Sequence, residues 1–211
     1  MRVDTQGGLV NKTLVLAYPG TGKTFAAENF ENVFDFEQQH YISIYDEDIR
    51  HLPLEQIKGA VGRRKPNPDW PQNFTRGISD VFADGRVVIT TFVPSVFEAI
   101  FQTAEIVEKK LGSAGCVIPI SKFITTFKGV RIILAVFDKN SFAELAERFR
   151  ARGNTEEFIE RRRLDFAEVH KLFEEAEGIE KVIIQSGSYL ADALVQHGIN
   201  LVPGTGQKNY Y

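Results

Sequence analysis

A short loop with two glycines constrains the fold of this chain more than any other feature of its sequence. The segment 13–17 is apolar and β-rich, and a helical pattern begins near Lys23. Glycines at positions 20 and 22 let the intervening backbone turn with its N–H groups facing inward, and the start of a helix favours an anion. The order strand, loop, helix therefore predicts a phosphate-binding loop in an α/β protein.

This loop matches the P-loop pattern, with Ala17 in the place of the usual leading glycine. In that pattern the lysine, here Lys23, bridges the β- and γ-phosphates of a nucleoside triphosphate, and the hydroxyl of Thr24 binds Mg²⁺. We therefore expect ATP and Mg²⁺ as cofactors. The residues expected to bind them are Pro19, Gly20, Thr21, Gly22, Lys23 and Thr24.

Strand-like and helical patterns alternate along the rest of the chain, which is typical of a parallel sheet with helices on both faces. We expect a three-layer P-loop NTPase fold with a central five-stranded parallel sheet, in a single domain over residues 1–203. The predicted strands are 13–17, 41–45, 86–91, 131–137 and 181–185. The predicted helices are 23–32, 71–83, 94–111, 141–150, 155–177 and 188–197.

Composition adds only broad limits. The chain has 211 residues, of which 43% are hydrophobic, and its net charge of −3 gives no global electrostatic signature for duplex nucleic acid. Cys116 is the single cysteine, so no internal disulfide forms, and no cysteine–histidine cluster has metal-ligand spacing. Residues 1–11 contain no apolar run of signal-peptide or membrane-spanning length, so we expect a cytoplasmic protein without a membrane partner. The sequence does not predict an oligomeric state.

Two segments, 52–73 and 112–128, interrupt the alternation, and the tail 204–211 is polar and glycine-containing. Insertions of this kind often form an acceptor site or a lid in α/β enzymes. For the second segment, a structural loop over the sheet edge is an equal alternative. We expect the tail to be loosely held.

An acidic run, Asp46-Glu47-Asp48, directly follows the predicted strand 41–45. At the carboxyl edge of the sheet, Asp46 is expected to hold Mg²⁺ or accept a proton, and Asp48 to contact the substrate. The alternative is a solvated turn that caps a helix. The sequence lacks the Asp-Glu strand end of water-activating ATPases and the Asn-Lys-x-Asp of GTPases, which favours a kinase.

The segment 145–164 resembles the lid of guanylate kinases, L-x-x-R-L-x-x-R-G followed by E-E-x-I-x-x-R-L. This resemblance implies an arginine-rich helical lid at about 148–163, in which Arg148 and Arg152 contact donor phosphates. It also implies that one arginine of the 161–163 group closes on the transferred phosphoryl group. Arg162 fits the spacing from Ile159, whereas Arg163 fits by the leucine that follows it.

Residues 182–188 resemble the last strand and loop of nucleotide kinases, which implies a contact of Ser188 with the donor base. The acceptor half departs from guanylate kinase, because nothing between Asp48 and Arg86 matches its small β domain. In its place, Arg63, Arg64 and Trp70 are expected to clamp a phosphate and stack a base. A rigid proline turn with a packed indole is the alternative. The residues 67–71 also resemble a stretch in uncharacterised P-loop proteins of phages and bacteria.

A second resemblance concerns the segment 44–50, which is similar to the acidic and arginine cluster of polynucleotide 5′-hydroxyl kinases. It implies that Asp46 or Asp48 is a general base and that Arg50 holds a phosphate of the acceptor.

Three hypotheses follow from the sequence. The leading one is an ATP- and Mg²⁺-dependent nucleoside monophosphate kinase acting on a nucleotide-like small molecule. The others are a polynucleotide or DNA hydroxyl kinase acting on a nucleic acid end, and an ATP-binding regulatory protein without kinase activity.

Overall fold

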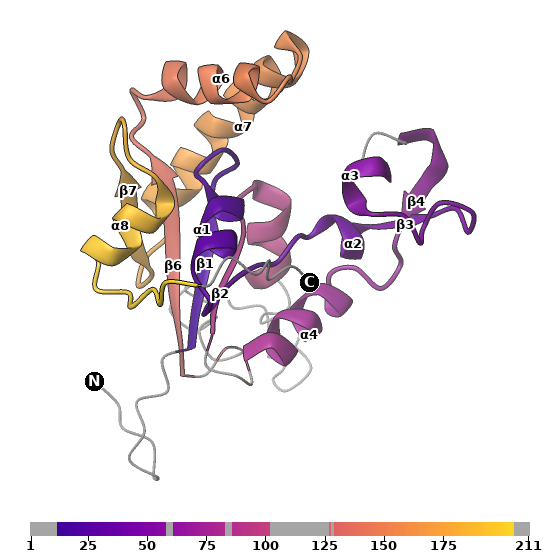
Figure 1. The fold of residues 1–211 in the computed structure, drawn as a ribbon, viewed down its shortest axis with the longest axis horizontal. Coiled ribbons are helices and arrows are strands. Elements are labelled where there is room, and N and C mark those ends of the chain that lie inside the picture. Colours follow the sequence, from indigo (N-terminus) through magenta and orange to yellow (C-terminus); the bar gives the residue numbers. More distant parts are fainter. Residues whose placement is uncertain (1–11, 58–60, 83–85, 102–126, 128, 205–211) are drawn as a thin grey trace, which may run out of the picture.

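The computed structural model of this protein describes residues 12–57, 61–82, 86–101, 127 and 129–204 (Figure 1). Its centre is a five-stranded sheet in the order β2-β5-β1-β6-β7, in which every pairing is parallel. The α/β class and the five-stranded parallel sheet expected from the sequence are thus confirmed. The strands are β1 (Lys12–Ala17), β2 (Val33–Asp35), β5 (Val87–Thr91), β6 (Val130–Phe137) and β7 (Glu180–Ile184).

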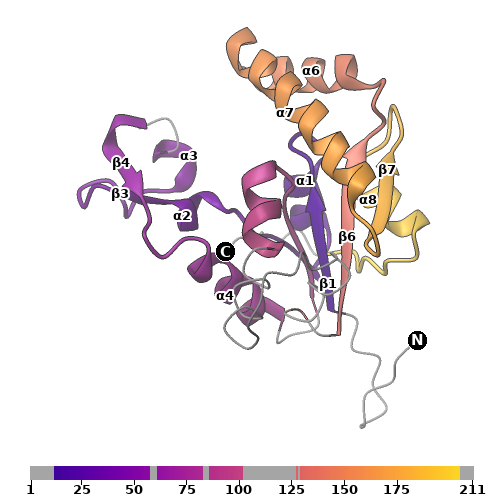
Figure 2. The same cartoon turned by 180° about the vertical axis from the view of Figure 1, so that it is seen from behind.

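The central strands are buried because helices cover both faces of the sheet. All residues of β5 and all but the first residue of β1 are buried, and both strands are apolar runs as expected for a covered parallel sheet. Figures 1 and 2 show α1 and α8 on one face and α7 on the other. The main helices are α1 (Lys23–Asn29), α4 (Gln72–Val81), α6 (Phe142–Ala151), α7 (Glu156–Glu175) and α8 (Leu190–Gln196).

The prediction of a central strand at 41–45 was wrong. The second strand of the sheet is β2, whose apolar residues Val33 and Phe34 are buried against β5. Instead, β3 (Ser43–Tyr45) pairs antiparallel with β4 (Arg64–Pro66) in a separate two-stranded sheet. Of the three residues of β3, Tyr45 is buried, and the other two are partly exposed.

The two-stranded sheet belongs to a projection that stands to one side of the central sheet in both views (Figures 1 and 2). We call it the arm, residues 43–57 and 61–66. The arm also contains α3 (Leu54–Ile57) and a short 3₁₀ helix, Val61–Arg63, and α2 (Gln39–Ile42) connects it to the sheet. The described part of the first predicted insertion, 52–57 and 61–73, thus forms part of the arm, the connection to α4 and the first residues of α4.

The loop after β1 lies where the chain changes direction across the sheet. From β1 the chain passes to β2 and then to β5 on one side, and later to β6 and β7 on the other. Backbone hydrogen bonds tie this point to both neighbours, from Tyr18 N–H to the carbonyl of Ala135 at 3.0 Å and from Phe92 N–H to the carbonyl of Ala17 at 2.9 Å. Ligands of open α/β sheets bind at such switch points, beyond the carboxyl ends of the strands.

The predicted helices agree with the structure to within a few residues where it describes them. The helix predicted at 94–111 is described over residues 94–101. The N-terminal residues 1–11, nearly all of the predicted insertion 112–128, and the tail beyond residue 204 lie outside the described residues. In the part of the chain that is described, no helix combines the length and apolar character needed to cross a membrane.

Candidate active site

The loop of residues 18–24, here called the glycine loop, is held tightly by the helices around it. Gly20 and Gly22 have φ angles of 85° and 97°, a region that side chains other than glycine rarely adopt. A Cβ atom on Gly20 would lie 2.5 Å from Cδ1 of Leu145, and one on Gly22 would lie 3.0 Å from Cδ1 of Tyr189. Both positions therefore need glycine, for conformation and for space.

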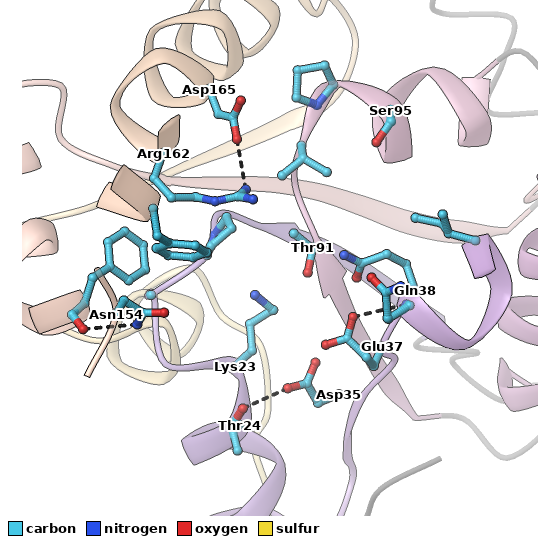
Figure 3. A pocket seen from close by; sticks show the side chains of 18 of the residues that line it. Lys23, Thr24, Asp35, Glu37, Gln38, Thr91, Ser95, Asn154, Arg162 and Asp165 are labelled. Carbon is cyan, nitrogen blue, oxygen red and sulfur yellow. Dashed lines mark hydrogen bonds and ion pairs between the residues drawn. The ribbon is translucent and has the colours of Figure 1, made fainter. Parts of the chain in front are cut away.

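A cleft of about 810 Å³ opens above this loop, at the carboxyl edge of the central sheet (Figure 3). Four segments line it: the glycine loop, the chain that follows β2, the chain that follows β5, and the hairpin of α6 and α7. Its polar lining residues include Lys23, Thr24, Asp35, Glu37, Gln38, Gln39, Thr91, Ser95, Arg152, Asn154, Arg162, Asp165 and Glu168.

Lys23 lies at the centre of this cleft (Figure 3). Burial lowers the pKa of its ammonium group, and nearby Asp35 and Glu37 act in the opposite direction. An ammonium placed between carboxylates and the guanidinium groups of Arg152 and Arg162 is suited to bind a multivalent anion.

The carboxylate at the carboxyl edge of the central sheet, beside Thr24, belongs to Asp35 and not to Asp46 as expected from the sequence. Thr24 donates a hydrogen bond through Oγ1 to Oδ2 of Asp35, at 3.1 Å. Asp35 and Glu37 flank the buried Phe36, whose backbone is fixed to β5 by its own N–H and by the hydroxyl of Thr90. Their side chains thus both line the cleft.

Sequence reasoning missed Asp35 and Glu37. The available signal was the alternation of acidic and apolar residues in 33–37, directly after the first predicted helix. Three strand residues are too few to stand out against the β-rich segment 41–45, so the strand was placed later in the chain.

Arg148, expected to contact donor phosphates, instead ties the hairpin to the glycine loop. Its guanidinium pairs with Glu144 at 2.5 Å and donates to the carbonyls of Ser188 at 3.0 Å and Gly20 at 3.5 Å. It also lies 4.3 Å from the ring centroid of Tyr189. Arg148 and Ser188 are not among the described residues that line the cleft.

The structure separates the three neighbouring arginines of α7. Arg161 pairs with Glu157 at 3.6 Å and Arg163 with Glu160 at 2.6 Å, and both of these arginines are exposed. Arg162 lines the cleft, where it pairs with Asp165 at 2.9 Å.

Two further features concern Arg162. Its Nε atom is buried without a hydrogen-bond partner in the described residues. Its backbone carbonyl accepts a hydrogen bond of 2.5 Å from the hydroxyl of Tyr18 in the glycine loop. That contact connects the loop directly to the helix carrying the guanidinium. The exposed Arg152, at the end of α6, lines the same cleft.

The remaining predicted site residues lie outside this cleft. Asp46 and Asp48 both pair with Arg63, Arg50 pairs with Glu47, and Arg64 donates to the hydroxyl of Tyr45. Most of these arm residues surround a separate hollow of about 350 Å³. The expectation that Asp46 lies at the carboxyl edge of the central sheet was wrong, because β3 is not part of that sheet. Trp70 packs on Phe74, with ring centroids 5.1 Å apart.

The residues of the cleft fit Mg²⁺ bound together with a phosphate ligand. No group of three or more histidine, cysteine, aspartate or glutamate side chains among the described residues could hold a metal ion alone. Mg²⁺ does not require one, since it keeps several waters and uses one or two protein oxygens plus substrate phosphates. Thr24 Oγ1 and the Asp35 carboxylate provide hard oxygen ligands side by side.

The fold and the cleft define an α/β protein with a polar, mixed-charge site at the carboxyl edge of a five-stranded parallel sheet. No protein-family model and no curated protein matches the sequence.

Proposed function

We propose that the protein is an ATP- and Mg²⁺-dependent phosphotransferase, in which the glycine loop is a P-loop and the α6–α7 hairpin is an arginine-rich lid. The observation that carries this proposal is the position of Lys23. Its ammonium extends from the glycine loop into the cleft, with Arg152 and Arg162 on the hairpin side and Thr24 beside Asp35. Several cations around one anion site are what transfer of a phosphoryl group requires.

Each residue has a defined part in this reaction. The backbone N–H groups of the glycine loop bind the β-phosphate, and Lys23 bridges the β- and γ-phosphates. Thr24 and Asp35 hold Mg²⁺, which supplies positive charge to the phosphate oxygens. Arg152 and Arg162 neutralise charge as the hairpin closes over the cleft and excludes water.

The acceptor is a nucleotide-like small molecule under this proposal. The leading candidate from the sequence is a nucleoside monophosphate. An acceptor hydroxyl is the second candidate, and the observation that favours it is the Glu37 carboxylate in the cleft. A regulatory ATP-binding protein would share the same glycine loop but would not transfer phosphate.

The test is transfer of labelled γ-phosphate from Mg·ATP to a panel of nucleoside monophosphates, nucleosides and 5′-hydroxyl oligonucleotides. We expect Lys23→Met to lower transfer by about 100-fold or more, because the variant loses one charged donor to the phosphates. The exposed α7 lysine variant Lys171→Met is the matched control and should behave as wild type.

Three outcomes of this experiment are informative. Transfer that depends on Lys23 supports the phosphotransferase. ATP binding that depends on Lys23, without transfer to any acceptor, supports the regulatory protein. Equal ATP binding by wild type and Lys23→Met would contradict the P-loop assignment.

A further inference from the structure

Tyr18, the first residue of the glycine loop, is fully buried and contacts two other elements of the fold. Its backbone N–H donates to the carbonyl of Ala135 in β6, at 3.0 Å. Its own carbonyl accepts a hydrogen bond of 2.8 Å from the hydroxyl of Thr21, which closes the turn of the loop. Its ring packs edge-on against Phe166 of α7, with ring centroids 5.2 Å apart. Tyr18 thus connects the glycine loop to both β6 and α7.

The hydroxyl of Tyr18 makes a contact that phosphate binding does not require. The P-loop pattern accepts any residue at this position, so the pattern does not explain a tyrosine here. The hydroxyl donates a hydrogen bond of 2.5 Å to the backbone carbonyl of Arg162 in α7. A carbonyl inside a helix already accepts the N–H four residues later, so α7 can form without this extra bond. Because Tyr18 is not among the described residues that line the cleft, its hydroxyl acts on the helix rather than on a ligand.

The hydroxyl and the ring of Tyr18 restrain α7 in different ways. Apolar packing against Phe166 holds the helix close to the loop but has little directional preference. A hydrogen bond requires a defined direction, so it also fixes the position of α7 along and around its axis. Burial raises the pKa of the Tyr18 hydroxyl above its ordinary value of 10.0, which keeps the group a neutral donor near neutral pH.

The guanidinium of Arg162 extends into the cleft from this point of α7 (Figure 3). Its Nη1 pairs with Oδ2 of Asp165 at 2.9 Å, and its Cζ lies 5.1 Å from the ring centroid of Phe158. Both partners belong to α7 itself, and Nε is buried without a hydrogen-bond partner in the described residues. These contacts move together with the helix. The position of the guanidinium relative to the glycine loop therefore depends on how α7 is held against that loop.

The charges of the cleft make this position important. Burial is the main effect that lowers the pKa of Lys23, and the charges of Arg152 and Arg162 lower it further, so these cations share one space. Asp165 and Glu168 line the arginine side of the same cleft. A bound phosphate must compete with Asp165 for the Arg162 guanidinium, and the strength of each attraction depends on distance. A shift of α7 away from the glycine loop would leave Arg162 with Asp165 and weaken its contact with the phosphates.

We infer that Tyr18 is a positioning residue of this phosphotransferase; this inference rests on the proposed function. Its hydroxyl holds α7 against the glycine loop, so that the Arg162 guanidinium faces the phosphates that the loop binds. Tyr18 itself touches neither substrate. Its contribution to the rate is made through Arg162, whose charge stabilises the transferred phosphoryl group.

The experiment is a double-mutant cycle with Tyr18→Phe, Arg162→Met and the variant that carries both changes. Phenylalanine keeps the ring that packs on Phe166 and removes only the hydroxyl. Tyr45→Phe is the matched control, because Tyr45 is a buried tyrosine of the arm, outside the described lining of the cleft. Turnover is measured as transfer of labelled γ-phosphate from Mg·ATP to the acceptor panel and as release of the label to water. Binding of Mg·ATP and thermal melting are measured for each variant, and rates are taken well below the lowest Tm.

We expect Tyr18→Phe to lower kcat by about 10-fold, with the affinity for Mg·ATP within about twofold of wild type, because the backbone of the loop is unchanged. Arg162→Met should lower kcat by about 100-fold or more. In the Arg162→Met background, Tyr18→Phe should change kcat by less than about twofold, since the hydroxyl then has no guanidinium to position. Tyr45→Phe should leave kcat unchanged.

The opposing outcomes separate this inference from the proposed function. An unchanged kcat in Tyr18→Phe, with or without a lower Tm, shows that the hydroxyl only stabilises the fold and overturns the positioning role. An equal loss of kcat in both backgrounds shows that Tyr18 does not act through Arg162 and overturns it as well. Mg·ATP binding without turnover in the wild type overturns the positioning role and supports a regulatory protein. Absence of Mg·ATP binding in the wild type overturns the proposed function itself.

Discussion

Arg148 and Arg152 lie one turn apart on α6, yet their surroundings differ. The Arg148 guanidinium is mostly buried, with hydrogen bonds to Glu144 and to the backbone carbonyls of Gly20 and Ser188. Arg152 is exposed at the helix end and lines the cleft. The same residue type in one motif therefore has two different settings: Arg148 connects segments of the fold, and Arg152 presents its cation to the cleft.

If Asp35 holds Mg²⁺, replacing it should change the Mg²⁺ requirement of the protein. Asp35→Asn should raise the Mg²⁺ concentration needed for half-maximal phosphate transfer by about 10- to 100-fold, because it removes the negative charge beside Thr24. Asp46→Asn should change this concentration by less than about twofold, since Asp46 pairs with Arg63 in the arm. Mg²⁺ titrations of both variants measure the difference. An effect of Asp46→Asn larger than that of Asp35→Asn would indicate that Asp46, rather than Asp35, binds Mg²⁺.

At the scale of elements, α6 is fastened to the loop between β7 and α8. Glu144 accepts hydrogen bonds from the hydroxyl of Ser186 at 2.6 Å and from the N–H of Gly187 at 3.1 Å, and it pairs with Arg148. The hydrogen bond from Ser186 is the main reason that the pKa of Glu144 lies below its ordinary value. This network holds the base of the hairpin, so closure would involve its outer part.

We predict that Glu144→Gln destabilises the protein in a pH-dependent way. A lowered pKa in the folded state means that the stabilisation is complete above the ordinary value of 4.5 and is lost as the pH falls below it. At pH 7 the variant should lose about 1 kcal/mol of unfolding free energy. The loss should shrink toward zero in more acidic buffer, where the wild-type carboxyl is protonated.

Urea denaturation at neutral pH and at an acidic pH measures this difference. Glu147→Gln is the control on the same helix, because Glu147 is exposed and its pair with Arg150 contributes little. A loss of stability in Glu144→Gln that stays constant with pH would show that packing, rather than the charge, is responsible.

The elements of the sheet differ in how well the sequence predicts them. β1, β5, β6 and β7 were predicted to within two residues, because buried parallel strands are continuous apolar runs. β2 was missed, since it has three residues at the sheet edge and ends in an aspartate. Its partner β5 follows it by more than fifty residues, so no local pattern identifies the pairing.

The residues of the candidate site also differ in how well the sequence predicts their positions. The glycine loop was predictable because its chemistry lies in consecutive residues. The roles of Asp35 and Glu37 depend on the position of β2, and the orientation of Arg148 depends on Gly20, which is 128 positions away. Arg162 could not be chosen over its neighbours from spacing alone, because helix rotation against the sheet decides which of them faces the cleft.

For the whole molecule, the position of Lys23 couples stability to ligand binding. Burial lowers the pKa of the Lys23 ammonium below its ordinary value of 10.5, so keeping it charged costs free energy in the ligand-free fold. That cost is complete below the lowered pKa, falls as the pH rises through it, and is gone above the ordinary value of 10.5. A bound triphosphate would offset it at neutral pH by supplying negative charge.

Lys23→Met should therefore be more stable than the wild type without ligand, by about 1 kcal/mol, because its methylene stem is kept and its charge is removed. A non-hydrolysable Mg·ATP analogue at about 100 times its Kd should stabilise the wild type by about 2.7 kcal/mol. For a chain of this size that corresponds to a rise in Tm of about 5 to 11 °C.

Thermal melting with and without the analogue tests both effects in one series, with Lys171→Met as the control for loss of an exposed lysine. The expected pattern is a raised Tm without ligand and no response to the analogue in Lys23→Met, and a full response in the control. If ligand-free Lys23→Met melts at a lower temperature than ligand-free wild type, the charge of Lys23 does not destabilise the fold. A full response in Lys23→Met would show that the triphosphate binds away from the glycine loop.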